Sequence, residues 1–175
     1  MSEMPTPLVT TQWLESQLGA SGLVILDCTT NQLSTPDGAY AFAPGDVDYA
    51  QGHIPGAVFC NVLATLADAD NPLPLMMPKP NSFKAAMEAL GVGDACRVVL
   101  YDRGNHNWAA RVWWSLRTYG FDNAALLDGG WKKWTAEGRP VSTETPEPAP
   151  ADFTPRYQPQ CITGKDNIMA VIGDG

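Results

Sequence analysis

Two short apolar runs, each followed by a turn and a helical pattern, occupy residues 98–134 and constrain the fold more than any other stretch. Residues 98–101 are β-branched and aromatic, as in a strand buried on both faces, and residues 108–119 carry apolar side chains at helical spacing. The order repeats, with a strand expected at residues 124–127 and a short helix at residues 131–137. This alternation predicts an α/β fold in which a parallel sheet has helices on both faces.

The residues before this stretch extend the same alternation. We expect strands over residues 23–26 and 57–60, a short helix capped by Thr10, and a further helix over residues 81–90. The polar residues 29–36 have the composition of a loop at the carboxyl end of the first of these strands.

The loop after the strand at residues 98–101 carries the most site-like chemistry of the chain. In open α/β sheets, ligands bind outside the carboxyl ends of the strands, where loop amides and the next helix N-terminus face an anion. The loop consists of Asp102, Arg103, Gly104, Asn105, His106 and Asn107. We therefore place the candidate site at this loop.

Charge and hydropathy exclude several function classes. The chain has 11 Lys and Arg residues against 19 Asp and Glu residues, which gives a net charge of −8. Nucleic acids and anionic membranes need a positive surface, so we expect neither as a partner. The first residues lack a basic and apolar leader pattern, and no apolar run is long enough for a bilayer span. These features predict a soluble, cytoplasmic protein.

The cysteines predict neither a disulfide framework nor a metal site, because they are widely spaced and form no Cys-x-x-Cys pair. They are Cys28, Cys60, Cys96 and Cys161. We expect buried free thiols, and we expect no cofactor or metal. Cys28 follows a predicted strand end, but no neighbour in the sequence is expected to lower its pKa, so packing is favoured over catalysis.

Three other features predict structural roles. His53 lies in a Gly-His-Ile-Pro-Gly corner after a polar approach over residues 46–51, and it is expected to bond local backbone rather than act as an acid or base. Trp113 and Trp114 fit core and interface packing better than a cofactor platform. The proline-broken residues 71–80 form an apolar loop that covers either this domain or a partner.

The composition changes after residue 141, where the pattern of strands and helices ends. Residues 8–141 form the predicted domain, and the proline-rich residues 142–160 are expected to be a connecting segment. Residues 161–175 begin an amphipathic helix with Ile168, Val171 and Ile172 on one face. That helix either docks on the domain or belongs to a second one.

Four motifs together resemble the rhodanese family, and more narrowly the amino-terminal domain of tandem-domain thiosulfate and 3-mercaptopyruvate sulfurtransferases. They are Gly52-His53-Ile54-Pro55-Gly56-Ala57, Tyr101-Asp102, Ala110-Arg111-Val112-Trp113-Trp114, and Leu127-Asp128-Gly129-Gly130-Trp131 with Trp134. The resemblance implies a five-stranded parallel sheet flanked by helices. It also implies that residues 161–175 are the truncated start of a second rhodanese module, a missing carboxy-terminal partner.

The sequence departs from the pattern of active rhodanese modules at one position. Active modules begin the site loop with a cysteine that carries sulfur as a persulfide, whereas this chain has Asp102 there. A carboxylate cannot form a persulfide. The resemblance therefore implies a sulfurtransferase as the parent protein, with a small anionic sulfur donor, and an inactive module in these 175 residues.

Three basic residues near the loop are candidates for the substrate side of the site. Arg111 is expected to pair with Asp102 or with the backbone, and direct substrate binding is the alternative. Arg103 and His106 have no evident partner in the sequence. They are either exposed to solvent or steer an anionic donor such as thiosulfate or mercaptopyruvate.

A non-enzymatic rhodanese-like binding or regulatory domain is the alternative function. Phosphatase chemistry is disfavoured, because the chain lacks the Asp-x-Asp arrangement at Asp102 and has no Cys-x5-Arg loop.

Overall fold

A five-stranded parallel sheet forms the centre of the molecule in the computed structural model, which describes residues 4–36 and 38–172. The strand order is β1-β7-β6-β2-β5, and every neighbouring pair is parallel. The strands are β1 (Leu8–Val9), β2 (Leu23–Asp27), β5 (Ala57–Phe59), β6 (Arg97–Tyr101) and β7 (Ala124–Leu127). The predicted fold class is confirmed, as are the bounds of β7, while β6 begins one residue before the predicted strand.

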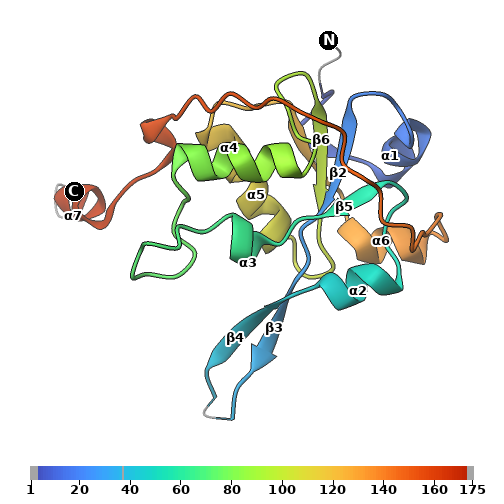
Figure 1. The fold of residues 1–175 in the computed structure, drawn as a ribbon. Helices are drawn as coiled ribbons and strands as arrows, with labels where there is room; N and C mark the ends of the chain where they lie inside the picture. The colour runs from blue at the N-terminus through green and yellow to red at the C-terminus, as the bar shows by residue number, and fades with distance from the viewer. Residues whose placement is uncertain (1–3, 37, 173–175) are drawn as a thin grey trace.

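Helices cover both faces of this sheet, as the apolar runs of the strands require. Figure 1 shows α4 and α5 on one side of the strands and α1 and α6 on the other. The helices around the sheet are α1 (Thr11–Gln17), α2 (Asp46–Gln51), α3 (Val62–Thr65), α4 (Pro80–Ala89), α5 (Asn107–Thr118) and α6 (Gly130–Ala136).

The two apolar cores meet opposite faces of the same strands. In β6, Val98 and Leu100 face the core beneath α4 and α5, whereas Val99 and Tyr101 face the core beneath α1 and α6. This alternation follows from the two-residue period of a strand. It places the carboxyl end of β6 between two packed layers, so the loop that follows starts from a rigid position.

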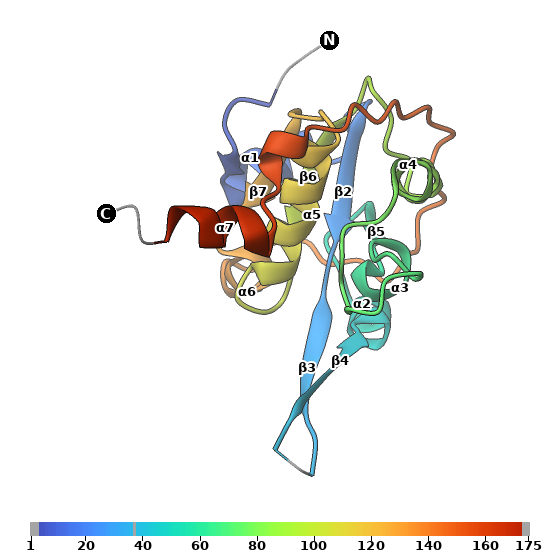
Figure 2. The same cartoon turned by 90° about the vertical axis from the view of Figure 1, so that its left-hand side faces the viewer.

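Residues 29–36 are not the loop that their composition suggests, and this expectation was wrong. β3 (Thr30–Ser34) and β4 (Tyr40–Pro44) form an antiparallel hairpin. The hairpin extends away from the body in both views (Figures 1 and 2). Most of the hairpin is exposed to solvent, so its strands need no apolar face. Their polar composition is therefore the same as that expected of a loop.

The polar approach at residues 46–51 is also regular structure, namely helix α2. Asp46 and Asp48 lie in its first turn, where carboxylates favour the positive helix end. Only Tyr49 of this helix is buried. A six-residue helix with a single buried residue has no helical repeat of apolar side chains, so the sequence pattern could not predict it.

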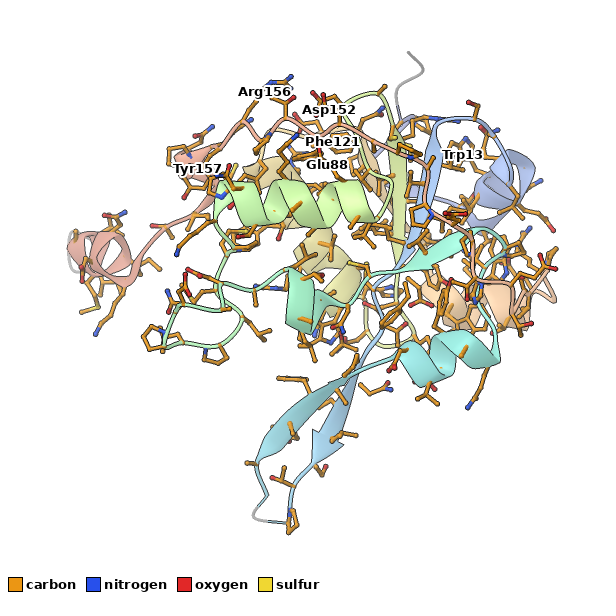
Figure 3. All side chains as sticks on the ribbon, in the orientation of Figure 1. Trp13, Glu88, Phe121, Asp152, Arg156 and Tyr157 are labelled. Carbon is orange, nitrogen blue, oxygen red and sulfur yellow. The ribbon has the colours of Figure 1, made fainter. Side chains whose placement is uncertain are left out.

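Residues 142–158 run along the surface of the domain in extended form, and both ends are bonded to it. At one end His53 and Ser142 exchange two backbone hydrogen bonds, of 2.8 and 2.9 Å. At the other end Gln158 donates to the carbonyl of Thr118 at 2.7 Å. Figure 3 labels Asp152 and Arg156 on this segment, beside Glu88 and Phe121 of the domain. Whether these residues also connect two modules stays a prediction.

Phe153 anchors the middle of this segment in the core. Its side chain is fully buried among the rings of Phe83 and Phe121, and its N–H donates to Glu88 Oε1 at 3.1 Å. The predicted boundary at residue 141 therefore does not mark the end of the apolar core.

Helix α7 (Lys165–Val171) follows a short 3-10 turn, η1 (Pro159–Cys161), and stands away from the sheet in Figure 1. Its apolar side chains Ile168, Met169 and Val171 are exposed. The predicted helix is present, while residues 173–175 of the expected second-module start lie outside the described residues. Among the helices that the structure describes, none is both long and apolar enough to cross a bilayer.

We predict that Phe153→Ala lowers the free energy of unfolding by about 3 kcal/mol, since it empties a fully buried aromatic site. Tyr157→Ala is the matched control, because Tyr157 lies on the same segment but is 49% exposed. Tyr157→Ala should lower the free energy of unfolding by less than half as much as Phe153→Ala. Chemical denaturation followed by circular dichroism measures both. Equal losses for the two variants would contradict the anchoring role.

Candidate active site

The carboxyl end of the sheet opens onto a pocket of about 720 Å³. The hairpin β3–β4, the loop at residues 102–107, the first turns of α5 and the start of α6 form its walls. Four of the six predicted loop residues line it, together with Arg111; these four are Arg103, Gly104, Asn105 and Asn107. The loop chosen from the sequence thus lines a concavity at the expected sheet edge, and its role as a binding site stays a prediction.

Asp102 organises the loop as a buried anion. Its residue is 2% exposed, and each carboxylate oxygen accepts two backbone N–H groups. Oδ1 accepts from Gly104 at 2.9 Å and His106 at 3.0 Å, while Oδ2 accepts from Trp108 and Ala109 at 3.1 Å. The last two are free amides of the α5 N-terminus, so the helix end and the loop amides converge on one charge.

His106 closes the loop onto α5 in a left-handed conformation, with φ of 68°. Its ring packs against Gly130, where a Cβ atom would lie 2.9 Å from His106 Cε1 and 2.8 Å from the Asp102 carbonyl oxygen. The glycine of the Asp-Gly-Gly-Trp motif therefore permits the close approach of α6 to the loop. His106 is half-buried and is not among the residues that line the pocket.

Arg103 has local partners that the sequence did not reveal. Its guanidinium Nη2 donates to the backbone carbonyls of Asp48, at 2.9 Å, and Gly52. The guanidinium carbon lies 4.1 Å from the Trp131 ring centroid, within the range of a cation–π contact. Arg103 thus joins the loop to the end of α2 and to α6, and the expectation of an unpartnered, solvent-exposed side chain was wrong.

Arg111 does not pair with Asp102, whose four hydrogen bonds all come from backbone. Its Nη2 instead donates to the carbonyl of Leu75, in the apolar loop at residues 71–80. The backbone contact that was the other structural expectation is the one observed. Burial lowers the pKa of the Arg111 guanidinium, which is the direction expected for a cation removed from water.

We predict that Asp102→Asn destabilises the protein by about 2–4 kcal/mol. The amide group keeps one acceptor oxygen but turns an NH₂ toward two N–H donors, which are then left unpaired in a buried site. The measurement is urea denaturation at neutral pH. Asp122→Asn serves as control, because the Asp122 side chain is 68% exposed and its ion pair with Arg117 is long, at 3.5 Å. If Asp102→Asn lowers the free energy of unfolding no more than Asp122→Asn does, Asp102 does not organise the loop.

A second buried carboxyl, Asp27, lies at the end of the neighbouring strand β2. Its Oδ1 accepts from the Thr29 N–H at 3.0 Å and from the Thr29 hydroxyl, while its buried Oδ2 has no hydrogen-bond partner among the described residues. Burial raises the pKa of the Asp27 carboxyl above its ordinary value of 3.8, and the bonds from Thr29 offset part of this rise. Burial and the Asp27 carboxyl in turn raise the pKa of Tyr101 well above its ordinary value.

This raised pKa predicts a pH dependence of stability. The folded state holds the Asp27 proton more tightly than the unfolded state does. The stability that this proton provides is therefore fully present below pH 3.8, and it is lost as the pH rises through the pKa of Asp27 in the folded state. Asp27→Asn should therefore raise the melting temperature more at pH 7 than at pH 4. Thermal scans at both pH values test this, with Asp122→Asn as control. An equal gain at the two pH values would contradict the assignment.

The expectation of buried free thiols holds for two of the four cysteines. Cys28 and Cys60 are fully buried free thiols at neighbouring strand ends, while Cys96 and Cys161 are free but only half-buried. Burial and the proximity of Cys60 raise the pKa of Cys28 well above its ordinary value. A protonated, inaccessible thiol is a poor nucleophile, so Cys28 does not replace a catalytic cysteine. The side chain of Cys60 is also fully buried and out of reach of a substrate.

His53 has the structural role expected of it. The ring is fully buried, stacks on Tyr49 at 3.9 Å between centroids, and places its two nitrogens 2.9 and 3.0 Å from the carbonyl oxygens of Tyr49 and Glu144. It therefore fastens the corner before β5 to the extended segment after α6.

A rhodanese-like domain model matches residues 10–137, which span every strand of the main sheet except β1. The chain belongs to the rhodanese family. The family resemblance drawn from the four motifs is thus confirmed. The match includes the loop at residues 102–107, so the pocket described above lies within the rhodanese domain.

Named relatives of this rhodanese domain are sulfurtransferases. The chain is 35% identical over 122 residues to a 3-mercaptopyruvate sulfurtransferase of Escherichia coli, covering 70% of this chain and 43% of the relative. It is 32% identical over 156 residues to a thiosulfate sulfurtransferase of Cricetulus griseus, covering 83% and 48%. The crystal structure of SseA, a 3-mercaptopyruvate sulfotransferase from Escherichia coli, superposes with a TM-score of 0.83 at 30% identity, covering 94% and 61%. The chain spans about half the length of the curated relatives it matches.

Phe42, Trp108 and Lys132 are among the pocket residues of this rhodanese domain that sequence reasoning missed. Phe42 comes from the unpredicted hairpin and meets Trp108 edge-on, with 5.2 Å between ring centroids. Lys132 lies just after the turn that follows β7. Because β7 and β6 are parallel neighbours, the rule that selected the loop after β6 could have found Lys132 too.

Proposed function

We propose that this rhodanese domain is the amino-terminal, non-catalytic module of a tandem-domain sulfurtransferase. The parent enzyme would move sulfur from thiosulfate or 3-mercaptopyruvate to cyanide or a thiol, through a cysteine on a second rhodanese module. The names of the relatives support the reaction class, and their greater length leaves room for a second module.

The state of the Asp102 loop carries this proposal. A rhodanese reaction needs a thiolate that attacks the outer sulfur of the donor; in thiosulfate the S–S bond then breaks and sulfite leaves with the bonding electron pair. Here the converging amides that would stabilise such a thiolate are all occupied by the Asp102 carboxylate. The loop geometry fits a thiolate site, but the group present cannot carry sulfur.

The pocket beside the loop is the part of the domain that we assign to the substrate side. Arg103 and Arg111 bring positive charge to it, and the rings of Phe42 and Trp108 supply a firm apolar wall. His106 supports the loop from behind and does not line the pocket. In the parent enzyme this surface would hold an anionic donor against the thiolate of the partner module.

A gain-of-function variant tests the proposal. We predict no thiosulfate:cyanide sulfur transfer by the wild-type chain and no persulfide in its mass spectrum after exposure to thiosulfate. Asp102→Cys places a thiol among the converging amides, and it should gain the mass of one sulfur atom.

Two controls accompany this test. Asp102→Ser should gain no sulfur, and Cys28→Ser should leave the wild-type result unchanged. Turnover by the wild-type chain that disappears in Cys28→Ser or Cys60→Ser would overturn the proposal of a non-catalytic module. Joining a rhodanese module with a cysteine-bearing loop after residue 172 should yield turnover; an inactive product would favour a binding domain instead.

A further inference from the structure

The β3–β4 hairpin is an uncharged element in a chain of net charge −8. Neither β3 (Thr30–Ser34) nor β4 (Tyr40–Pro44) contains an Asp, Glu, Lys or Arg residue. The hairpin extends away from the body in both views (Figures 1 and 2), and two of its large apolar side chains are strongly exposed, Leu33 at 48% and Tyr40 at 69%. Exposed edge strands attract other strands, and charged side chains are a common protection against this. The hairpin lacks that protection.

The hydrogen bonds at the two ends of the hairpin determine which backbone groups point outward. At its base, the Gly45 N–H donates to the Thr29 carbonyl at 3.0 Å. Near its tip, the Thr35 N–H donates to the Ala39 carbonyl, also at 3.0 Å. In an antiparallel ladder, every second pair of opposite residues exchanges hydrogen bonds. These two bonds therefore fix the bonding pattern of all pairs between them.

The outward backbone groups of β3 belong to Gln32 and Ser34. Leu33 is opposite Ala41 and lies an even number of residues from both end bonds, so Leu33 and Ala41 exchange hydrogen bonds within the hairpin. The N–H and C=O groups of Gln32 and Ser34 then point away from β4. Within the part of the chain that the structure describes, nothing bonds to them, and both residues are exposed. The edge of β3 thus offers two donors and two acceptors to a further strand.

The edge of β4 is the poorer of the two. Its outward positions are Tyr40, Phe42 and Pro44, because they alternate with the bonded residues of that strand. Pro44 has no N–H to donate, and proline is a typical residue of protected edges. The ring of Phe42 is also in contact with Trp108. We therefore consider β3 to be the edge that is open to pairing.

We propose that β3 pairs in antiparallel fashion with β3 of a second copy of this chain, which joins two hairpins into one four-stranded sheet. A two-fold axis at Leu33 places Gln32 of each copy opposite Ser34 of the other, so the outward groups of both residues exchange hydrogen bonds. The two Leu33 side chains then lie opposite each other in a non-hydrogen-bonded pair, where cross-strand side chains are closest.

Charge favours a second copy as the occupant of this edge. Two chains of net charge −8 repel each other, and this repulsion is smallest where neither surface carries charge. A highly charged partner strand would find no opposite charge on β3. The exposed Leu33 needs an apolar counterpart, which a second Leu33 supplies on the symmetry axis. The pairing involves neither Asp102 nor sulfur transfer, so it holds or fails independently of the proposed function.

Analytical ultracentrifugation of the complete 175-residue chain tests the proposal. We expect a reversible equilibrium between monomer and dimer in the micromolar range, since pairing of two short strands forms a small interface. A chain that remains monomeric up to millimolar concentration would overturn the proposal and leave the edge to a strand of another protein or module.

Leu33→Lys should raise the dissociation constant of the dimer at least about tenfold, because it places two like charges directly opposite each other. Val47→Lys is the matched control. Val47 is also an exposed apolar residue, at 66%, but it lies on α2 outside the hairpin. Val47→Lys should leave the dissociation constant unchanged. Equal weakening by the two lysines would indicate general charge repulsion and would contradict the β3 interface.

Ser34→Pro separates the edge from the hairpin itself. The Ser34 N–H makes no bond to β4, so proline at this position keeps the ladder of the hairpin but removes a donor from its edge. We expect the dimer to weaken while the melting temperature of the monomer is kept. A dimer that tolerates both Leu33→Lys and Ser34→Pro would use another surface and would overturn the proposal.

A cross-link tests the register of the pairing. Leu33→Cys places two thiols opposite each other on the symmetry axis, within the Cα separation that a disulfide spans. Mild oxidation should therefore give a covalent dimer that peptide mapping assigns to residue 33, whereas Val47→Cys should give none. Cross-linking of both variants to the same extent would show random collision and would contradict the proposed register.

Discussion

The bonds between one buried carboxylate and four backbone amides hold the functional edge of this domain together. Asp102 lies where β6 ends, and its oxygens fix both the loop and the first turn of α5. The Asp102 carbonyl also accepts from the N–H of Trp131 at 3.2 Å, which brings α6 to the same point. One residue therefore sets the relative positions of a strand, a loop and two helices, and the pocket walls depend on it.

Arg103 extends this arrangement to the other side of the site. It stacks on Trp131 of α6 and bonds the carbonyls at the end of α2, so its charge is held at the pocket rim by contacts that are not ionic. Arg111 is held in the same manner through the carbonyl of Leu75. Carbonyls rather than carboxylates therefore hold both guanidiniums at the pocket, and neither forms an ion pair among the described residues.

Much of the fold was predictable from local pattern, and the failures share a physical cause. The strands at residues 97–101 and 124–127 are buried on both faces and read as continuous apolar runs, so their bounds were found to within one residue. The hairpin β3–β4 and helix α2 bury little, so hydrophobic periodicity could not reveal them. The partners of Arg103 and Arg111 are backbone carbonyls far away in sequence. Every residue has such a carbonyl, so residue types do not indicate which one is the partner. Phe153 lies in a proline-rich stretch whose composition conceals its burial in the core.

The extended segment at residues 142–158 has a geometric consequence for whatever follows it. The segment is bonded to the domain at both ends and in the middle, and the Cys161 carbonyl accepts from Trp114 Nε1 at 3.0 Å, on the helix that lines the pocket. The proline-rich stretch is thus not a long free tether. A second module that begins with α7 would be joined to this domain by residues 162–164, which start beside α5. The short linker would set the effective concentration of that module at the pocket, in the roughly millimolar range typical of short linkers.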